Sequence, residues 1–276
     1  MSIRHGISPI FAVVALALTL AGGLGLWASP VVSAEHTGHA APDLDAVLSR
    51  TIAQVARDRE LEEQFKARYA FTRTKVTETR DGSGALKKRS EEHFVNPTPA
   101  EEGAPPRGGP DADDATQPEA KRPYQRHDFK VDAALLERFR FTYLGAAVVE
   151  GRAVWVVDFE PAGEGLPARS LKERFVNLMA GRLWIDQEEA ALARAEFRLT
   201  GPVNVAGGLV GALKRCAVSL DRRRTPDGLW YPRLLTWEIE GRKLFSTRRM
   251  EHRDEMAEVR PVAQLGQAGR ALLGAP

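Results

Sequence analysis

The spacing of apolar residues changes once along the chain, from a helical period to alternation. From Asp43 to Phe65 apolar positions recur at helical spacing, which predicts an amphipathic helix with one stripe to bury. From Lys66 onward apolar and polar residues alternate, and turn signals recur at short intervals. The main body is therefore predicted to be a meander of antiparallel strands. The turn signals are Asp81-Gly82-Ser83-Gly84, Glu150-Gly151, Ala180-Gly181, Thr225-Pro226-Asp227-Gly228 and Glu240-Gly241.

The predicted strands have one apolar and one polar face. Arg194, Glu196 and Glu238 fall on the polar side, so we expect one wet face and one covered face. The helices would cover the apolar face only in part. The pattern alone leaves a filled core and a ligand cavity equally open. The apolar sets are Ala153, Trp155, Val157 and Phe159; Ala193, Ala195, Phe197 and Leu199; and Leu235, Trp237 and Ile239.

Three segments depart from the alternating pattern. Residues 96–123 are rich in Pro, Gly and acidic residues, which predicts a disordered insert within the sheet. A short helix is predicted at Asp132 to Phe139, with Asp132 as its N-cap. Residues 257–276 are predicted to form a loosely ordered tail. Residues 43–256 are accordingly expected to form a single domain.

The N-terminus has the layout of a secretion signal. Arg4 and His5 precede an uncharged apolar run from Ile10 to Leu26, and Val32-Ser33-Ala34 supplies small residues for cleavage. We expect residues 1–34 to be removed near Ala34 and the mature protein to be periplasmic. The alternative is an inner-membrane anchor formed by residues 10–26, although three glycines weaken that helix.

Composition and motifs point away from catalysis. The single cysteine, Cys216, excludes an internal disulfide, and its alternation with Val218 and Leu220 predicts a buried apolar residue. No zinc-helix, paired-cysteine, phosphate-loop or nucleophile-elbow motif is present, so we expect no catalytic residue, metal or cofactor. A net charge of +2 is too small to indicate nucleic acid. The basic runs Arg222–Arg224 and Arg248–Arg249 indicate either a solvated strand edge or attraction to an anionic membrane surface.

Five blocks of the predicted strands and turns follow one another in a distinctive order. They are Phe141–Gly145, Glu150–Arg152, Trp155–Pro161, Gly181–Asp186 and Leu192–Leu199. Residues in them have structural reasons: Gly151 and Gly181 would permit tight turns, Pro161 would end a strand, and Asp186 would close a turn. In order and spacing these blocks resemble the LolA/LolB-like outer-membrane lipoprotein-sorting proteins of the bacterial periplasm. The resemblance implies a mainly β fold with helices (α+β), namely an open, curved antiparallel half-barrel capped by amphipathic helices.

The resemblance also implies a function, that of a carrier holding lipid acyl chains or lipoproteins in an apolar cavity without catalysis. Transient contact with membrane proteins or with the membrane surface would accompany delivery. The alternative is an envelope-stress sensor domain that detects lipids or mislocalised lipoproteins; the short chain after Met256 favours the carrier. The candidate cavity-lining residues are Tyr69, Phe71, Trp155, Val157, Phe159, Phe197, Leu199, Leu235, Trp237 and Ile239.

Overall fold

The computed structural model describes residues 41–96, 133–205, 211–243 and 246–262. The predicted signal peptide, and all but the first residue of the predicted insert, lie outside these ranges. So does the predicted tail from residue 263 onward. The described helices include none that is both long enough and apolar enough to cross a bilayer.

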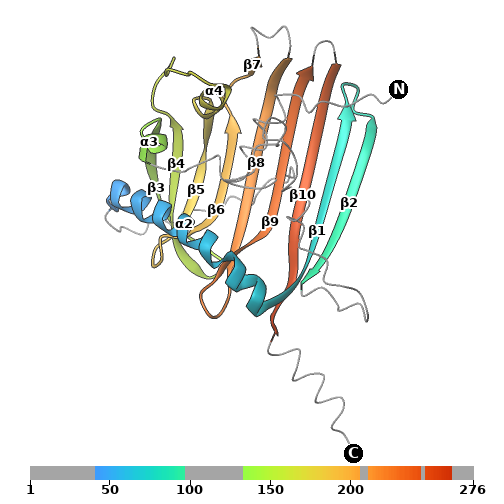
Figure 1. Cartoon of the computed structure of the whole chain (residues 1–276). Coiled ribbons are helices and arrows are strands. Elements are labelled where there is room, and N and C mark those ends of the chain that lie inside the picture. Colours follow the sequence, from blue (N-terminus) through green and yellow to red (C-terminus); the bar gives the residue numbers. More distant parts are fainter. Residues whose placement is uncertain (1–40, 97–132, 206–210, 244–245, 263–276) are drawn as a thin grey trace, which may run out of the picture.

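Ten described strands form one open antiparallel sheet in the order β2-β1-β10-β9-β8-β6-β5-β4-β3, with β7 paired to β8 (Figure 1). Strands β3 and β2 are the two edges, so the sheet curves without closing. This confirms the predicted fold class, a mainly β, open antiparallel sheet with helices. The strands are β1 Tyr69–Asp81, β2 Leu86–Asn96, β3 Phe139–Val149, β4 Arg152–Pro161, β5 Met179–Asp186, β6 Leu192–Leu199, β7 Val203–Val205, β8 Gly211–Arg224, β9 Trp230–Lys243 and β10 Ser246–Pro261.

Three of the five predicted turns connect strands as expected. The Asp81 carboxylate accepts hydrogen bonds from the amides of Ser83 (2.9 Å) and Ala85 (3.1 Å) in the β1–β2 turn. Glu150 and Gly151 have φ angles of 50° and 77°, the left-handed conformation that a tight two-residue hairpin requires. The β8–β9 turn is closed by Thr225, whose Oγ1 accepts a hydrogen bond from the Leu229 amide at 2.9 Å.

The other two predicted turns are wrong, because both glycines lie inside strands. Gly181 is paired with Phe159 and Phe197 within β5. A Cβ there would lie 2.1 Å from the Glu196 carbonyl oxygen, so this glycine permits a close approach of β5 and β6. Gly241 is paired with Arg248 within β9, which continues to Lys243.

The helices lie on one face of the sheet. Helix α2, Leu44–Arg68, begins at Asp43, whose carboxylate accepts from the amides of residues 45 and 46, and it extends slightly beyond the predicted end. It runs diagonally across the lower end of the sheet (Figure 1). Helix α3, Ala133–Leu136, is one turn long and shorter than predicted. Helix α4, Leu171–Val176, was not predicted.

Strand β10 continues past Met256, where the loose tail was predicted to begin. It ends at Pro261, which is opposite Tyr69 of β1. The prediction is therefore wrong for residues 257–261. Their side chains are mostly small or polar, but β1 provides a partner for their backbone groups.

The alternation predicts that the whole outer face is exposed to water, but part of this face is buried. A β-bulge between β5 and β6 shifts Ala193 out of register with Ala195, and Ala193 packs with Val154 and Trp230. This corrects its predicted place beside Ala195. On the inner face Cys216 is 1% exposed, and burial raises the pKa of its thiol to about 12. The prediction of a buried, apolar cysteine is confirmed.

Candidate functional site: an apolar cavity under the helices

The helix-bearing face of the sheet changes from apolar to polar across the strands. Away from α2, the apolar part spans β4 to β9 and the polar part spans β10, β1 and β2; beneath the end of α2, β1 and β10 carry the apolar residues Phe71 and Met256. Because the register places one residue of each strand in line, a single row shows the change. Its members, in spatial order, are Phe159, Gly181, Phe197, Val218, Trp237, His252, Thr77 and Ser90.

A cavity of about 110 Å³ lies above the apolar part of this face. Helix α3 contributes Leu135 and Leu136 to its walls, and Phe141 comes from the edge strand β3. Every lining residue is apolar, so a ligand there could gain only from burial and shape. The full lining is Leu135, Leu136, Phe139, Phe141, Phe159, Val176, Met179, Leu183, Leu192, Ala195 and Phe197.

Helix α2 is fixed along its length. Its first turns pack Val47 and Leu48 onto the sheet. Its last turns place Phe65 among three aromatic rings at 5.1–5.5 Å. Between these ends, Asp58 pairs with Arg222 at 2.7 Å, and both side chains are about nine-tenths buried. Removing either partner would leave the other charge buried without its ion-pair partner, so the pair ties α2 to the sheet.

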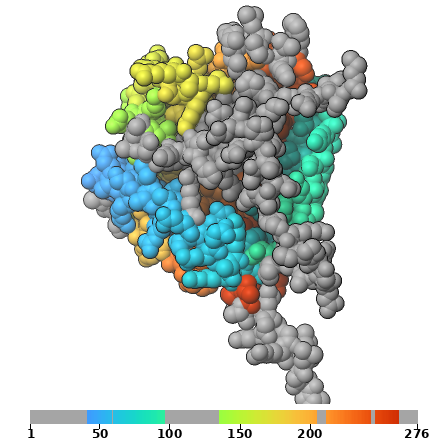
Figure 2. Space-filling model, viewed as in Figure 1, coloured from blue at the N-terminus to red at the C-terminus, as the bar shows by residue number. Residues whose placement is uncertain are grey.

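Helix α3 is a much smaller cover. It is a single turn, and Leu135 and Leu136 are only half-buried. After it, the Arg138 guanidinium donates to the Asn177 side-chain oxygen at 2.7 Å and to the Pro167 carbonyl at 3.1 Å. Figure 2 shows α2 across the lower part of this face and the region of α3 and α4 above it at the upper left. The cavity therefore lies beneath α3 and α4, and α2 contributes no residue to its lining.

The rim of the sheet near α2 is held by ion pairs. Asp186 accepts two hydrogen bonds from the Arg152 guanidinium, at 2.6 and 2.9 Å, and others from the amides of residues 188 and 189. Burial alone would raise the pKa of Asp186, but these donors lower it. This geometry confirms that Asp186 closes the turn after β5. The basic run 222–224 is also paired, with Asp58, Glu150 and Glu189.

Trp237 and His252 mark the boundary between the apolar and polar parts of the inner face. Their rings stack with centroids 5.1 Å apart, and Thr77 Oγ1 lies 2.7 Å from His252 Nδ1. Burial lowers the pKa of His252, so the ring is neutral at physiological pH. Beyond this boundary Arg73 forms a two-point pair with Asp254. Across the described ranges, no group of three or more His, Cys, Asp or Glu side chains could hold a metal ion.

Two of the ten residues predicted to line a cavity, Phe159 and Phe197, line this one. The others are dispersed because α2 divides the inner face into separate clusters. Tyr69 and Phe71 pack beneath the end of α2, Trp155 and Val157 beneath its beginning, Trp237, Ile239 and Leu199 in or against the main core, and Leu235 is half-buried.

Sequence reasoning missed the walls contributed by α4 and the residues that follow it. Val176 and Met179 line the cavity, and both are buried. The missed signal is Ser170-x-x-Glu173, the pattern of a capped helix start. In the structure Ser170 Oγ accepts from the Glu173 amide at 3.1 Å.

Comparison with known proteins found no match among protein-family models or curated protein sequences. Among solved structures, the chain is similar to a putative outer membrane lipoprotein-sorting protein domain from Vibrio parahaemolyticus (9% identity, 78% of this chain and 93% of that chain, TM-score 0.25). It is also similar to the LolA superfamily protein NE2245 from Nitrosomonas europaea (10% identity, 80% of this chain and 94% of that chain, TM-score 0.26). A third similar structure is the Pseudomonas aeruginosa MucA/MucB complex (10% identity, 80% of this chain and 99% of that chain, TM-score 0.26). The Vibrio and Nitrosomonas proteins are of the class that the sequence resembles. At such TM-scores the likeness carries no argument about function.

Proposed function

We propose that this protein is a periplasmic carrier or binding protein for the acyl chains of lipids or lipoproteins, and that it performs no catalysis. The observation that carries the proposal is the cavity lined by eleven apolar residues between the sheet and its smaller cover. A partly open cavity without a polar side chain suits a hydrocarbon chain, because it offers burial and no hydrogen bond.

The size of the cavity indicates how a ligand would enter. An apolar cavity of roughly 150 Å³ accepts a molecule the size of benzene, so about 110 Å³ accepts only a short stretch of an acyl chain. A longer chain requires one cover to move. Helix α3 is one turn long and half-buried, whereas α2 is anchored at three places, so α3 is the cover that we expect to open.

The energy of such binding is sufficient for a carrier. Each methylene removed from water contributes about 0.8 kcal/mol, before the cost of ordering the chain and displacing α3. The polar part of the inner face, from His252 to Ser90, offers no such gain. We therefore place the chain along strands β3 to β9.

The proposal is tested with the delipidated protein and a fluorescent fatty acid. Leu136→Asp places a carboxylate at the half-buried wall formed by α3, where water can solvate it without unfolding the sheet. We expect the affinity for the fatty acid to fall at least about tenfold, equivalent to about 1.4 kcal/mol. Val148→Asp is the matched control, since Val148 is 63% exposed on the neighbouring strand and lines no cavity.

Native mass spectrometry of the protein isolated from the periplasm completes the test. We expect a bound acyl lipid, intact and in stoichiometric amount. A folded wild-type protein that carries no lipid and does not bind the fatty acid would refute the proposal. Co-purification of a membrane protein without lipid would favour the sensor alternative.

A further inference from the structure

We propose that a second pocket, on the other side of α4 from the cavity, binds the anionic end of the acyl ligand, a carboxylate or a phosphate. The inference rests on the proposed acyl-chain function and assigns the ligand class. Arg174 is the residue that would meet the anion.

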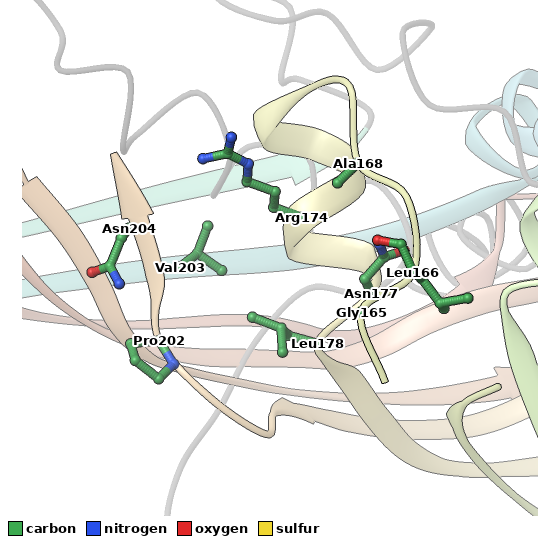
Figure 3. Close-up of a pocket in the computed structure, with 9 residues that line it drawn as sticks. All are labelled: Gly165, Leu166, Ala168, Arg174, Asn177, Leu178, Pro202, Val203 and Asn204. Carbon is green, nitrogen blue, oxygen red and sulfur yellow. The ribbon is translucent and has the colours of Figure 1, made fainter. Parts of the chain in front are cut away.

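The pocket has a volume of about 330 Å³, within the usual range of small-molecule sites. Val203 lies between Asn204 and Arg174, Leu178 lies below Arg174, and Arg174 projects from α4 on the side that faces β7 (Figure 3). The pocket thus combines an apolar floor with polar groups at its margins. The lining is Gly165, Leu166, Ala168, Arg174, Asn177, Leu178, Pro202, Val203 and Asn204.

The charge of the pocket favours an anion. Its lining contains one cation and no carboxylate. Arg174 is exposed, and among the described residues it has no ion-pair partner. The nearest acidic residue of α4, Glu173, is already used by Arg138 and by the Arg169 amide. An arriving carboxylate or phosphate would therefore meet an available guanidinium without like-charge repulsion.

The side-chain amide of Asn177 also lines the pocket, but it already has hydrogen-bond partners within the protein. Asn177 donates to the Leu166 carbonyl at 2.8 Å and accepts from Arg138, so it shapes the wall. Asn204, on β7, is exposed, and its amide can add a donor on the opposite side of the pocket from Arg174.

The pocket and the cavity share one short segment of chain. Arg174, Asn177 and Leu178 line the pocket, whereas Val176 and Met179 line the cavity. An amphiphile could therefore place its anionic end beside Arg174 while its chain passes the end of α4 and enters the apolar cavity. A ligand with both features would satisfy two sites that the fold places next to each other.

The test compares lauric acid, lauryl phosphate and lauryl alcohol, which share one chain and differ in the end group. Wild-type protein should bind the acid and the phosphate about fivefold more tightly than the alcohol at low salt, a preference typical of a solvated ion pair and lost at high salt. Arg174→Gln should bind all three alike, with its affinity for the alcohol unchanged. Arg198→Gln, which removes an exposed arginine from β6 outside the pocket, should behave as wild type.

The outcomes separate this inference from the proposed function. If the wild type binds all three amphiphiles equally and Arg174→Gln changes nothing, the anionic subsite is overturned and acyl-chain binding stands. If the wild type binds none of them, the acyl-binding function itself fails, and the subsite with it. Displacement of lauric acid by inorganic phosphate at equal concentration would show a site for free anions and would also overturn the inference.

Discussion

Filling the apolar cavity should stabilise the protein and exclude its ligand. Ala195 is buried on β6 and lines the cavity, and a leucine there adds three carbons. At about 24 cal/mol per Å³, a cavity of about 110 Å³ corresponds to roughly 2.6 kcal/mol. Burying three further carbons at about 0.8 kcal/mol each gives a similar figure.

Because a leucine will not fill the space perfectly, we expect Ala195→Leu to raise the free energy of unfolding by about 1–2 kcal/mol. For a chain of this size that raises the melting temperature by roughly 3–6 °C. The same substitution should weaken binding of a fluorescent fatty acid at least about tenfold, since the added side chain occupies the space for the ligand. Thermal unfolding and fatty-acid titration on one delipidated sample measure both effects.

Ala193→Leu is the matched control. Ala193 is equally buried on the same strand, but it packs with Val154 and Trp230 outside the cavity. Overpacking there should cost about 1–3 kcal/mol and leave fatty-acid affinity unchanged. If Ala195→Leu destabilises the protein as Ala193→Leu does, the cavity has no room for the added side chain and the reasoning is refuted. If it stabilises the protein but leaves affinity intact, the ligand binds elsewhere.

Two further predictions concern the strand contact beside the cavity and the polar boundary of the inner face. Gly181→Ala should destabilise the protein toward the upper end of a range of about 1–3 kcal/mol, because its Cβ would lie 2.1 Å from the Glu196 carbonyl oxygen. The control is Gly163→Ala, where no atom lies within 4 Å of the added Cβ, and it should leave stability nearly unchanged. Denaturant unfolding measures both variants. His252 has a lowered pKa in the folded state, so the unfolded chain takes up its proton first as pH falls below about 6.5. The contribution of neutral His252 to the free energy of unfolding is thus present above that pH and is lost below it. The variant His252→Asn should therefore show a smaller fall in stability between roughly pH 6.5 and 5. An unchanged slope of stability against pH would contradict this reasoning.

The strand pattern could be predicted because alternation reports directly which side chains are covered. Asp81-Gly82-Ser83-Gly84 and Glu150-Gly151 were identified as turns from local chemistry, which acts over a few residues. Gly181 and Gly241 are misplaced for the same reason: a glycine inside a strand and a glycine in a turn look alike in sequence. Only the pairing of β5 with β6, and of β9 with β10, distinguishes them.

The cavity could be predicted only in part, since its walls depend on where the covers lie. Phe159 and Phe197 share a face with Trp237 and Ile239, and alternation cannot show which of them a helix will cover. The structure places α2 over part of that face and packs Trp237 into a filled core. Helix α4 is six residues long, too short for periodicity to reveal.

The arrangement of the covers decides which part of the inner face can exchange a ligand. Helix α2 is held by the ion pair of Asp58 and Arg222, which is about nine-tenths buried and would have to be broken for the helix to leave the sheet. Its displacement would expose the Phe65 cluster as well, so the cost of opening by this route is high. Helix α3 contacts the cavity through two half-buried leucines, and the segment after it is tied to the residues around α4 by the hydrogen bonds of Arg138. Under the proposed function, an acyl chain would enter at α3 by replacing the contacts of the two leucines, while α2 stays on the sheet.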